Sequence, residues 1–413
     1  MANLNGVTTT KGKIGASALA PTTSTTLMIV GGYATLNPAP NGIFHVLYTM
    51  KDAELLGITA EADQLEPAHV FRHVSEFFRI AGEGTKLYLA IRPVIETVQY
   101  ILTVVGPAYS IAQDILIATD GDVRQLAIAD NSPLGATLDQ LEVTLTNSLA
   151  LAQALADWAY KNHFPLRILL EGRNWQGNSA VTTNLRSLNF PNVAVVIGQD
   201  FSYSQNTSAN DKYADVGTAV GTLAAAQINQ NIGDNTAFNL TDDTKGKWLV
   251  PSLSNGLANS VQYAALQTLE DKGFIFGISY VGMAGVRWNN DHVCVPVLID
   301  SDGNINEHTL AYGRTVDEAV RGLRAALLPK VKTTQPVNPV TGLLPPGVVK
   351  NFDGIGDTMF GNMVNRGQIS AGKTTTDPNS DLLIEKVLKI AYAIVPTGTI
   401  GEIRGTINLQ NKL

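Results

Sequence analysis

The stretch VFRHVSEFFRIAGEGTKLYLAIRP, residues 70–93, decides the fold class of this 413-residue chain. Its first half has apolar residues at offsets 0, 1, 4, 7, 8 and 11, which is the spacing of one helix face. Its second half, KLYLAIRP, follows two glycines and is typical of a strand. Upstream, TLMIVGG at residues 26–32 is a short apolar run that ends in glycine, as buried strands often do. A strand, a helix and a strand in this order indicate an α/β beginning.

The same alternation continues toward the middle of the chain. We predict strands at residues 124–129, 166–172 and 192–198 and helices at residues 149–160 and 213–228. In the second of these helices, Gly217 and Gly221 allow another backbone to approach closely. Strands that alternate with helices predict a partly parallel sheet covered by helices on both faces.

A second pattern begins near Leu253. A helix that ends at LEDKGF precedes several short strands with turn glycines, and a further helix is predicted over residues 315–331. The segment TTQPVNPVTGLLPPG, residues 333–347, is rich in proline and glycine and predicts a long surface loop. Residues 381–395 fit the spacing of a helix and also that of a strand, and we predict a helix there.

Both ends of the chain suit pairing with a partner. Residues 402–410 alternate in polarity with a period of two and predict a strand with one apolar face. Residues 1–24 are mostly small and polar, with isolated apolar residues, and predict an extended arm. An unpaired strand edge is normally hidden or paired, and a neighbour's sheet is one place to pair it. The predicted inter-subunit residues are Val7, Ile14, Ile403, Gly405, Ile407 and Leu409. The alternative is that the arm is a frayed tail and the last strand pairs within its own chain.

Composition excludes several classes of protein. Hydrophobic residues make up 45% of the chain and charged residues 16%, which excludes disorder and fibrous repeats. A formal charge of −7 repels nucleic acid, so we expect no direct nucleic-acid contact. Because the apolar runs are far shorter than the ~20 residues of a bilayer span, we expect no membrane insertion. The one cysteine, Cys294, lies in an apolar run and is expected to be buried.

The motif GQISAGKT, residues 367–374, satisfies the P-loop pattern letter for letter. In a P-loop, Gly367 and Gly372 would shape the phosphate cradle, Lys373 would reach the phosphates and Thr374 would hold magnesium. That chemistry needs a buried strand before the loop and a helix directly after it. Here the segment after the motif contains Pro378 where the helix should begin, so a lysine-bearing surface loop is the preferred interpretation.

Other chemical motifs are weaker still. His69 and His73 are four residues apart on a predicted helix, but the glutamate of the H-E-x-x-H motif is absent. The acidic run DSDGNINE, residues 300–307, has its glycine at the wrong position for a calcium loop and favours a hairpin turn. We therefore predict no catalytic residue, no metal site and no cofactor.

Several segments resemble the tail sheath proteins of contractile phages and related contractile injection systems. The resemblance rests on the arm that leads into TLMIVGG, on FHVLYTMKDAELLGI, on the helix VFRHVSEFFRIAG with the strand KLYLAIRP, on AVGTLAAAQI, and on LEDKGFIFGISYVGMAGVRWNNDH. The chain departs from the better-known branch after Leu323, where the family's aromatic and asparagine-rich segment has no clear equivalent. The proline loop at residues 335–347 is also unusual for that branch.

The resemblance implies an α/β, mixed α+β fold in which an outer domain is inserted between terminal segments that form an inner assembly domain with extended arms. It implies an arm at residues 1–24, an outer domain at 25–250 and an inner domain at 251–413 that ends in an inter-subunit strand. The subunit would polymerise helically with itself around an inner tail tube, with baseplate and terminator proteins as further partners. It would belong to a virion tail or phage-like particle assembled in the host cytoplasm. The alternatives are a P-loop enzyme and another phage tail or baseplate protein.

Overall fold

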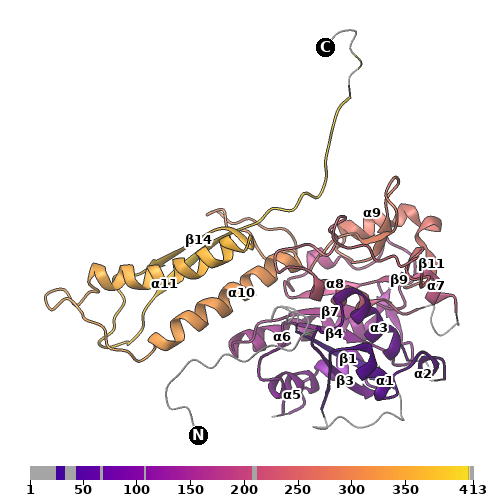
Figure 1. Ribbon diagram of the computed structural model, residues 1–413, viewed down its shortest axis with the longest axis horizontal. Helices are drawn as coiled ribbons and strands as arrows, with labels where there is room; N and C mark the ends of the chain where they lie inside the picture. Colours follow the sequence, from indigo (N-terminus) through magenta and orange to yellow (C-terminus); the bar gives the residue numbers. More distant parts are fainter. Residues whose placement is uncertain are drawn as a thin grey trace, which may run out of the picture.

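The computed structural model describes residues 25–32, 43–65, 68–106, 108–206, 212–407 and 409. Within them the chain forms a mixed α+β fold with a large body and an elongated arm (Figure 1). This agrees with the predicted fold class. No helix within these described ranges combines the length and hydropathy needed to cross a bilayer.

A six-stranded sheet forms the centre of the body. In spatial order its strands are β2 (His45–Leu47), β3 (Leu87–Pro93), β1 (Thr26–Gly32), β4 (Gln125–Ala129), β7 (Arg167–Glu171) and β8 (Val193–Val196). All neighbouring pairs are parallel except β2 with β3. Counted along the chain, the parallel strands therefore have the order 2-1-3-4-5, which is a doubly wound arrangement. The strands predicted from TLMIVGG and KLYLAIRP are the neighbouring parallel strands β1 and β3.

Helices cover both faces of this sheet, as the alternation predicted. On one face lie α3 (Val70–Ala81) and α8 (Val216–Ala225). On the other lie α4 (Val98–Leu102), α5 (Ile111–Ala118) and α6 (Val143–Lys161). Successive residues of β1 point to opposite faces, so Met28 packs in the first core and Leu27 in the second.

The contact between α3 and α8 depends on two glycines, as predicted. A Cβ at Gly217 would lie 2.5 Å from the backbone of His73, and one at Gly221 would lie 2.9 Å from the Cα of Phe77. A side chain at either position would push the helices apart. The lack of a side chain at these two positions lets α8 pack closely against α3.

Shorter elements complete the body. The helices are α1 (Met50–Leu55), α2 (Ala60–Leu65), α7 (Phe201–Ser204) and α9 (Tyr263–Asp271), with 3₁₀ turns η2 (Leu185–Ser187) and η3 (Asn259–Val261). The strands are β5 (Thr137–Leu138), β6 (Leu141–Glu142), β9 (Gly198–Asp200), β10 (Pro251–Leu253), β11 (Leu257–Ala258), β12 (Gly277–Ser279) and β13 (Val286–Trp288). Since β10 pairs with β9, main-chain hydrogen bonds cross the predicted domain boundary at residues 250/251. The three-part domain division itself stays a prediction.

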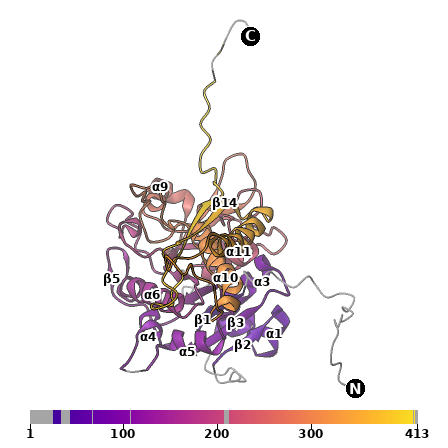
Figure 2. The same cartoon turned by 90° about the vertical axis from the view of Figure 1, so that its left-hand side faces the viewer.

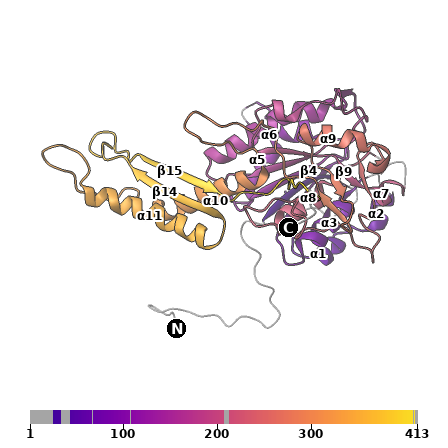
Figure 3. The same ribbon diagram turned by 90° about the horizontal axis from the view of Figure 1, so that it is seen from above.

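The arm consists of four elements that extend from the body. They are α10 (Leu310–Leu327) with the 3₁₀ turn η4 (Leu328–Lys330), α11 (Pro346–Asn365), β14 (Ile369–Thr376) and β15 (Ile390–Pro396). Figure 3 shows α11 beside the antiparallel pair β14–β15, and Figure 2 shows the arm end-on in front of the body. The loop predicted from the proline-rich segment lies between η4 and α11, at the end of the arm far from the body.

Two features of the arm differ from the sequence interpretation. The predicted helix at residues 381–395 is wrong, because residues 390–396 form β15, the strand that the same pattern also allowed. The residues fit the spacing of a helix and of a strand, and pairing with β14 selects the strand. This long-range pairing cannot be read from the spacing of apolar residues alone. The helix α11 was not predicted. Its buried residues recur every three or four positions: Val348, Phe352, Gly356, Phe360 and Met363.

Candidate assembly interface

The C-terminal segment leaves the molecule as an extended chain without regular secondary structure. Three of its predicted interface residues are almost fully exposed: Ile403 by 85%, Ile407 by 96% and Leu409 by 103%. Gly405 lies between them and is also exposed. A strand needs a partner ladder, and none of the described residues supplies one to residues 402–407, so the predicted strand is not formed within one chain. Val7 and Ile14 lie outside the described residues.

This segment starts at a fixed point on the molecule. Thr397 follows β15 directly, and its Oγ1 accepts a hydrogen bond from the Asn229 side chain at 3.0 Å. The same amide donates to the carbonyl of Gly367, which precedes β14. Figures 1 and 3 both show the segment departing from the junction of arm and body. The Asn229 amide thus ties the start of the C-terminal segment to the start of β14.

The motif GQISAGKT does not form a P-loop. Its residues from Ile369 onward lie in β14, where Lys373 pairs with Ala393 of β15 and is exposed. A phosphate cradle needs backbone N–H groups in a loop at a helix N-terminus, whereas these groups belong to a strand ladder. The glycine has a packing role instead, because a Cβ at Gly372 would lie 2.5 Å from the ring of Phe360 on α11. The nucleotide-binding assignment of Gly367, Gly372, Lys373 and Thr374 is therefore not supported by the fold.

A buried arginine joins the arm to the body. Arg167 at the start of β7 binds both carboxylate oxygens of Asp317 on α10, at 2.8 Å each. It also donates to the carbonyl of Gly313 at 2.8 Å and pairs with Glu307 at 2.5 Å. Arg167 is 1% exposed and Asp317 3%. Burial of the pair in this geometry fixes the first half of α10 against the central sheet.

Two further charged residues hold the start of α10. The carboxylate of Asp291 accepts a hydrogen bond from the backbone N–H of Ala311, in the first turn of the helix, at 2.9 Å. Burial raises the pKa of Asp291 to about 6. Arg314 donates to the carbonyls of Ala226 and Gln227 at the end of α8, and burial lowers its pKa to about 10. The direction of α10, and with it that of the arm, is set by buried polar contacts.

The two histidines considered as metal ligands belong to a buried network between α3 and α8. His69 contacts the hydroxyl of Tyr203 at 3.2 Å, and the Nδ1 of His73 accepts a hydrogen bond from the N–H of Gly217. Burial lowers the pKa of His69 to about 3 and that of His73 to about 4, so both are neutral at pH 7. Nearby, Arg72 binds Asp215 at 2.7 Å. In the described part of the chain, no group of three His, Cys, Asp or Glu residues is placed to hold a metal ion.

Another ion cluster lies where the carboxyl ends of β4 and β7 meet. Arg173 donates to the carbonyls of Asp130 and Ser132 and binds Glu142 at 2.9 Å. Glu171, at the end of β7, accepts hydrogen bonds from the N–H groups of Asp130 and Ala214. Burial raises the pKa of Glu171 to about 8. Doubly wound sheets often bind ligands at this edge, and here the chain's own charged side chains meet there.

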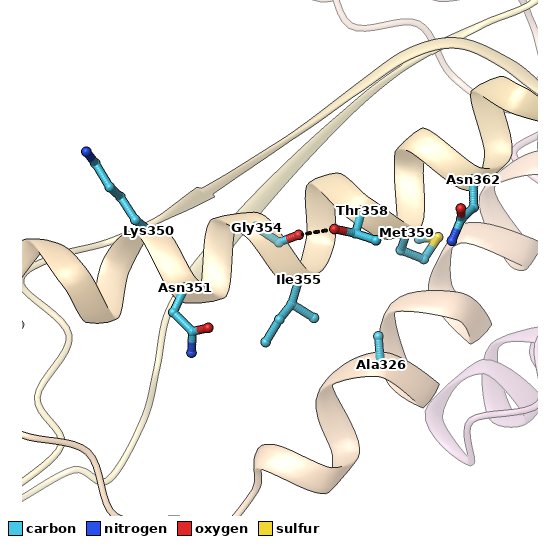
Figure 4. A pocket seen from close by; sticks show the side chains of 8 residues that line it. All are labelled: Ala326, Lys350, Asn351, Gly354, Ile355, Thr358, Met359 and Asn362. Atoms are coloured by element: carbon cyan, nitrogen blue, oxygen red, sulfur yellow. Dashed lines mark hydrogen bonds between the residues drawn. The ribbon is translucent and has the colours of Figure 1, made fainter.

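An open groove of about 510 Å³ runs along the arm between α10 and α11 (Figure 4). Its lining residues are Ala326, Lys350, Asn351, Gly354, Ile355, Thr358, Met359 and Asn362. Only Ala326 comes from α10, and the Ile355 side chain points from α11 toward that helix (Figure 4). The lining carries aliphatic, thioether, amide and hydroxyl groups together with the amine of Lys350, which points away from α10 (Figure 4), and it contains no carboxylate, histidine or cysteine.

Two remaining predictions concern the body. Residues 300–307 form a hairpin turn, since Ile299 and Ile305 bridge in antiparallel fashion and Asp300 accepts from the N–H of Asn304. Cys294 is fully buried, as its apolar neighbours indicated. Within this turn the carboxylate of Asp300 accepts hydrogen bonds from the N–H groups of Asp302 and Asn304.

The described residues thus combine a doubly wound body, an arm held by buried polar contacts and an exposed C-terminal segment. Residues 14–292 match the sequence family described as "DUF2586, N-terminal domain". This match covers more than half of the chain, and the chain therefore belongs to that family. No curated protein matches the chain.

Two solved structures are similar to the chain over nearly its whole length. One is a chain in the cryo-EM structure of the anti-feeding prophage baseplate, with six-fold symmetry imposed: the TM-score is 0.60 at 14% sequence identity, covering 99% of this chain and 100% of that one. The other is the sheath tail protein of Desulfitobacterium hafniense, with a TM-score of 0.49, 11% identity, and coverage of 95% of this chain and 100% of that one. The first likeness shows that the chain shares its fold with a component of a phage-like baseplate structure.

Proposed function

We propose that this chain is a structural subunit of a contractile tail sheath. In this role it polymerises helically around an inner tube, and contraction of the sheath drives the tube through a target envelope. The observation that carries the proposal is the C-terminal segment, whose apolar side chains are almost fully exposed in the single chain. Apolar residues that alternate along an extended segment are suited to a strand in another subunit's sheet.

The arm supplies a suitable acceptor for such a strand. Within the described residues its sheet consists of the two strands β14 and β15, and two-stranded sheets are marginal unless further strands or a helix support them. Helix α11 covers one face, which leaves the sheet able to grow at an edge. A chain that offers a strand at one place and accepts one at another makes a head-to-tail contact, and such contacts build helical polymers when they do not close.

The mechanical role needs no nucleotide. An extended sheath would be a kinetically trapped state, and contraction would release free energy by forming more extensive contacts between subunits. The partners would be other copies of the chain, the inner tube protein, and baseplate and terminator proteins. The particle would be a virion tail or phage-like injection device assembled in the host cytoplasm. Contacts through Val7 and Ile14 in the N-terminal arm remain part of this proposal.

A second candidate is a different structural component of the same kind of particle. The fold likeness at a TM-score of 0.60 is to a chain in a baseplate structure, which favours a ring-forming subunit at the end of the tail. A baseplate subunit would use the same strand exchange but would stop at a ring. The two candidates differ in the size of the assembly that the purified protein forms.

Negative-stain microscopy of the purified full-length protein tests both candidates. Long cylinders support the sheath, closed rings without stacking support the baseplate component, and monomers at all concentrations contradict both. Deletion of residues 401–413 should leave a folded monomer that forms no long polymers, with an unchanged circular dichroism spectrum. Normal cylinders from that truncated chain would contradict the role of the C-terminal segment.

A matched pair of double variants separates the two faces of the segment. Ile403→Asn with Ile407→Asn removes the apolar face and should abolish polymers. Arg404→Asn with Thr406→Asn alters the polar face by the same number of residues and should leave polymers intact. Each isoleucine contributes about 1.5–3 kcal/mol when it is buried, so the two groups of variants should differ strongly in the concentration needed for assembly.

A further inference from the structure

The two edges of the β14–β15 sheet are not equivalent. In an antiparallel pair, residues alternate between those whose N–H and C=O groups bond to the partner strand and those whose groups point outward. The N–H of Asp377, just beyond β14, donates to the carbonyl of Lys389, so Asp377 and Lys389 form a bonded pair. Because bonded and outward-pointing residues alternate along β14, the backbone groups of Thr376 and Thr374 point outward.

The outer edge of β14 is closed by two carboxylates. Asp357 on α11 accepts a hydrogen bond from the N–H of Thr374 at 2.8 Å. Asp353, one turn earlier on the same helix, accepts from the N–H of Thr376 at 2.7 Å. Both N–H groups would otherwise be available to an incoming strand. Helix α11 also packs closely on β14, as shown by the contact of Phe360 with Gly372.

The outer edge of β15 carries no such cover. Ile390 and Tyr392 lie opposite Thr376 and Thr374, so their backbone N–H and C=O groups also point outward. Within the described residues, no side chain or backbone group bonds to them on that side. The Tyr392 side chain lies toward α11, with its ring 6.2 Å from that of Phe360, and is still 39% exposed. An added strand would therefore find both hydrogen-bonding groups and uncovered apolar surface.

Resting on the proposed function, we infer that β15 is the only edge of this sheet that accepts a strand, and that Asp353 and Asp357 close β14 to the same strand. The occupant is the C-terminal segment of a second copy of the chain. Unpaired edges invite unwanted pairing, and side chains that block one edge restrict growth to the other. The two carboxylates thereby give the polymer a single direction of growth at each arm.

The identity of the occupant follows from polarity. An added strand with Ile403 and Ile407 on the α11 side would bury them beside Tyr392 and Ile394. Its polar side, with Glu402 and Arg404, would then continue the solvent-facing side of the sheet, where Ala391, Ala393 and Lys373 are exposed. Glu402 and Arg404 already pair with each other at 2.7 Å, as residues on the same side of an extended chain do. The segment cannot reach its own β15 edge without reversing direction after Thr397.

Disulfide mapping tests the edge directly. Cysteine is placed at Ala393 on β15 or at Thr375 on β14 in one chain, and at Glu402, Arg404 or Thr406 in a separately tagged chain. Adjacent strands are ~4.8 Å apart, so a strand on the β15 edge lies within disulfide range of position 393 and about twice that distance from 375. The native Cys294 is buried and does not compete. We expect mixed disulfides with A393C and none with T375C, and the reverse result would overturn the inference.

Two sets of variants test the mechanism. Tyr392→Pro removes an outward N–H without removing a bond to β14, so it should abolish polymers while the monomer keeps its circular dichroism spectrum. Asp353→Ala with Asp357→Ala should make T375C reactive toward the C-terminal cysteines. Asp353→Asn with Asp357→Asn is the matched control, because the amide oxygen still accepts from the strand, and should leave T375C unreactive.

Failure of this inference differs from failure of the proposed function. If the unmodified chain never polymerises, the proposed function is wrong. If it polymerises and T375C crosslinks as well as A393C without any change at Asp353 and Asp357, or if neither position crosslinks, the edge assignment is wrong and the sheath proposal stands.

Discussion

Replacement of Arg167 by methionine should release the arm from the body. The change keeps most of the side-chain volume and removes every contact of the guanidinium, including both bonds to Asp317. Asp317 is 3% exposed, so its carboxylate would be left buried without its partner. Breaking a buried ion pair from one side typically costs about 3–5 kcal/mol. We expect most of that loss to fall on the docking of α10, because Asp317 and the carbonyl of Gly313 belong to α10 and Glu307 lies just before it, while the bond to the carbonyl of Pro191 stays within the body.

Hydrogen–deuterium exchange measures this local effect. If exchange of α10 proceeds by local opening, a loss of at least 3 kcal/mol accelerates it by about 100-fold, since each 1.4 kcal/mol is a factor of ten. The central strands β1 and β4 should keep their protection. The double variant Arg167→Met with Asp317→Leu removes both charges and should restore much of the protection. Exchange of α10 within about two-fold of the unmodified chain in the single variant would refute the reasoning.

Two further predictions concern the body. Glu171 has a folded-state pKa raised to about 8, so the folded chain holds a proton that the unfolded chain releases near pH 4.5. Stability should therefore fall as pH rises from about 4.5 to 8, and Glu171→Gln should flatten that part of the curve of unfolding midpoint against pH; identical curves would contradict it. Gly217→Ala places a Cβ 2.5 Å from the backbone of His73 and should destabilise by at least about 1–3 kcal/mol. Gly354→Ala on α11 meets no atom within 4 Å and should instead stabilise by about 0.5–1 kcal/mol, so equal effects in thermal unfolding would show that packing is not the cause.

The central sheet was predictable because its signal is local. A buried parallel strand is a short apolar run, and TLMIVGG, KLYLAIRP and RQLAIA each became one. The glycines of α8 were also predictable, since close helix packing needs a residue without a side chain. In each case the residue types of the element itself indicate how it is buried.

The arm was harder to predict because its structure depends on contacts between distant segments. Residues 390–396 satisfy two periodicities, and only pairing with β14 selects the strand. Helix α11 begins at Pro346, directly after Pro345, and contains glycines, which obscured the regular recurrence of Phe352, Gly356 and Phe360. The candidate interface was found in part. The polarity of residues 402–410 identified the donor segment, but Asn229, Asp353 and Asp357 carry no motif and their roles appear only once the fold brings them to β14 and Thr397.

The point at which the C-terminal chain leaves the arm determines how the molecule resists force. Residues after Pro396 leave β15 at the end of the arm next to the body and turn away from the axis of the arm (Figures 1 and 2). Tension on them therefore acts first on the hydrogen bond between Asn229 and Thr397 and on the last pairs of β15 with β14, which would open in sequence from that end. The body-side end of this sheet is where a stretched link would yield first.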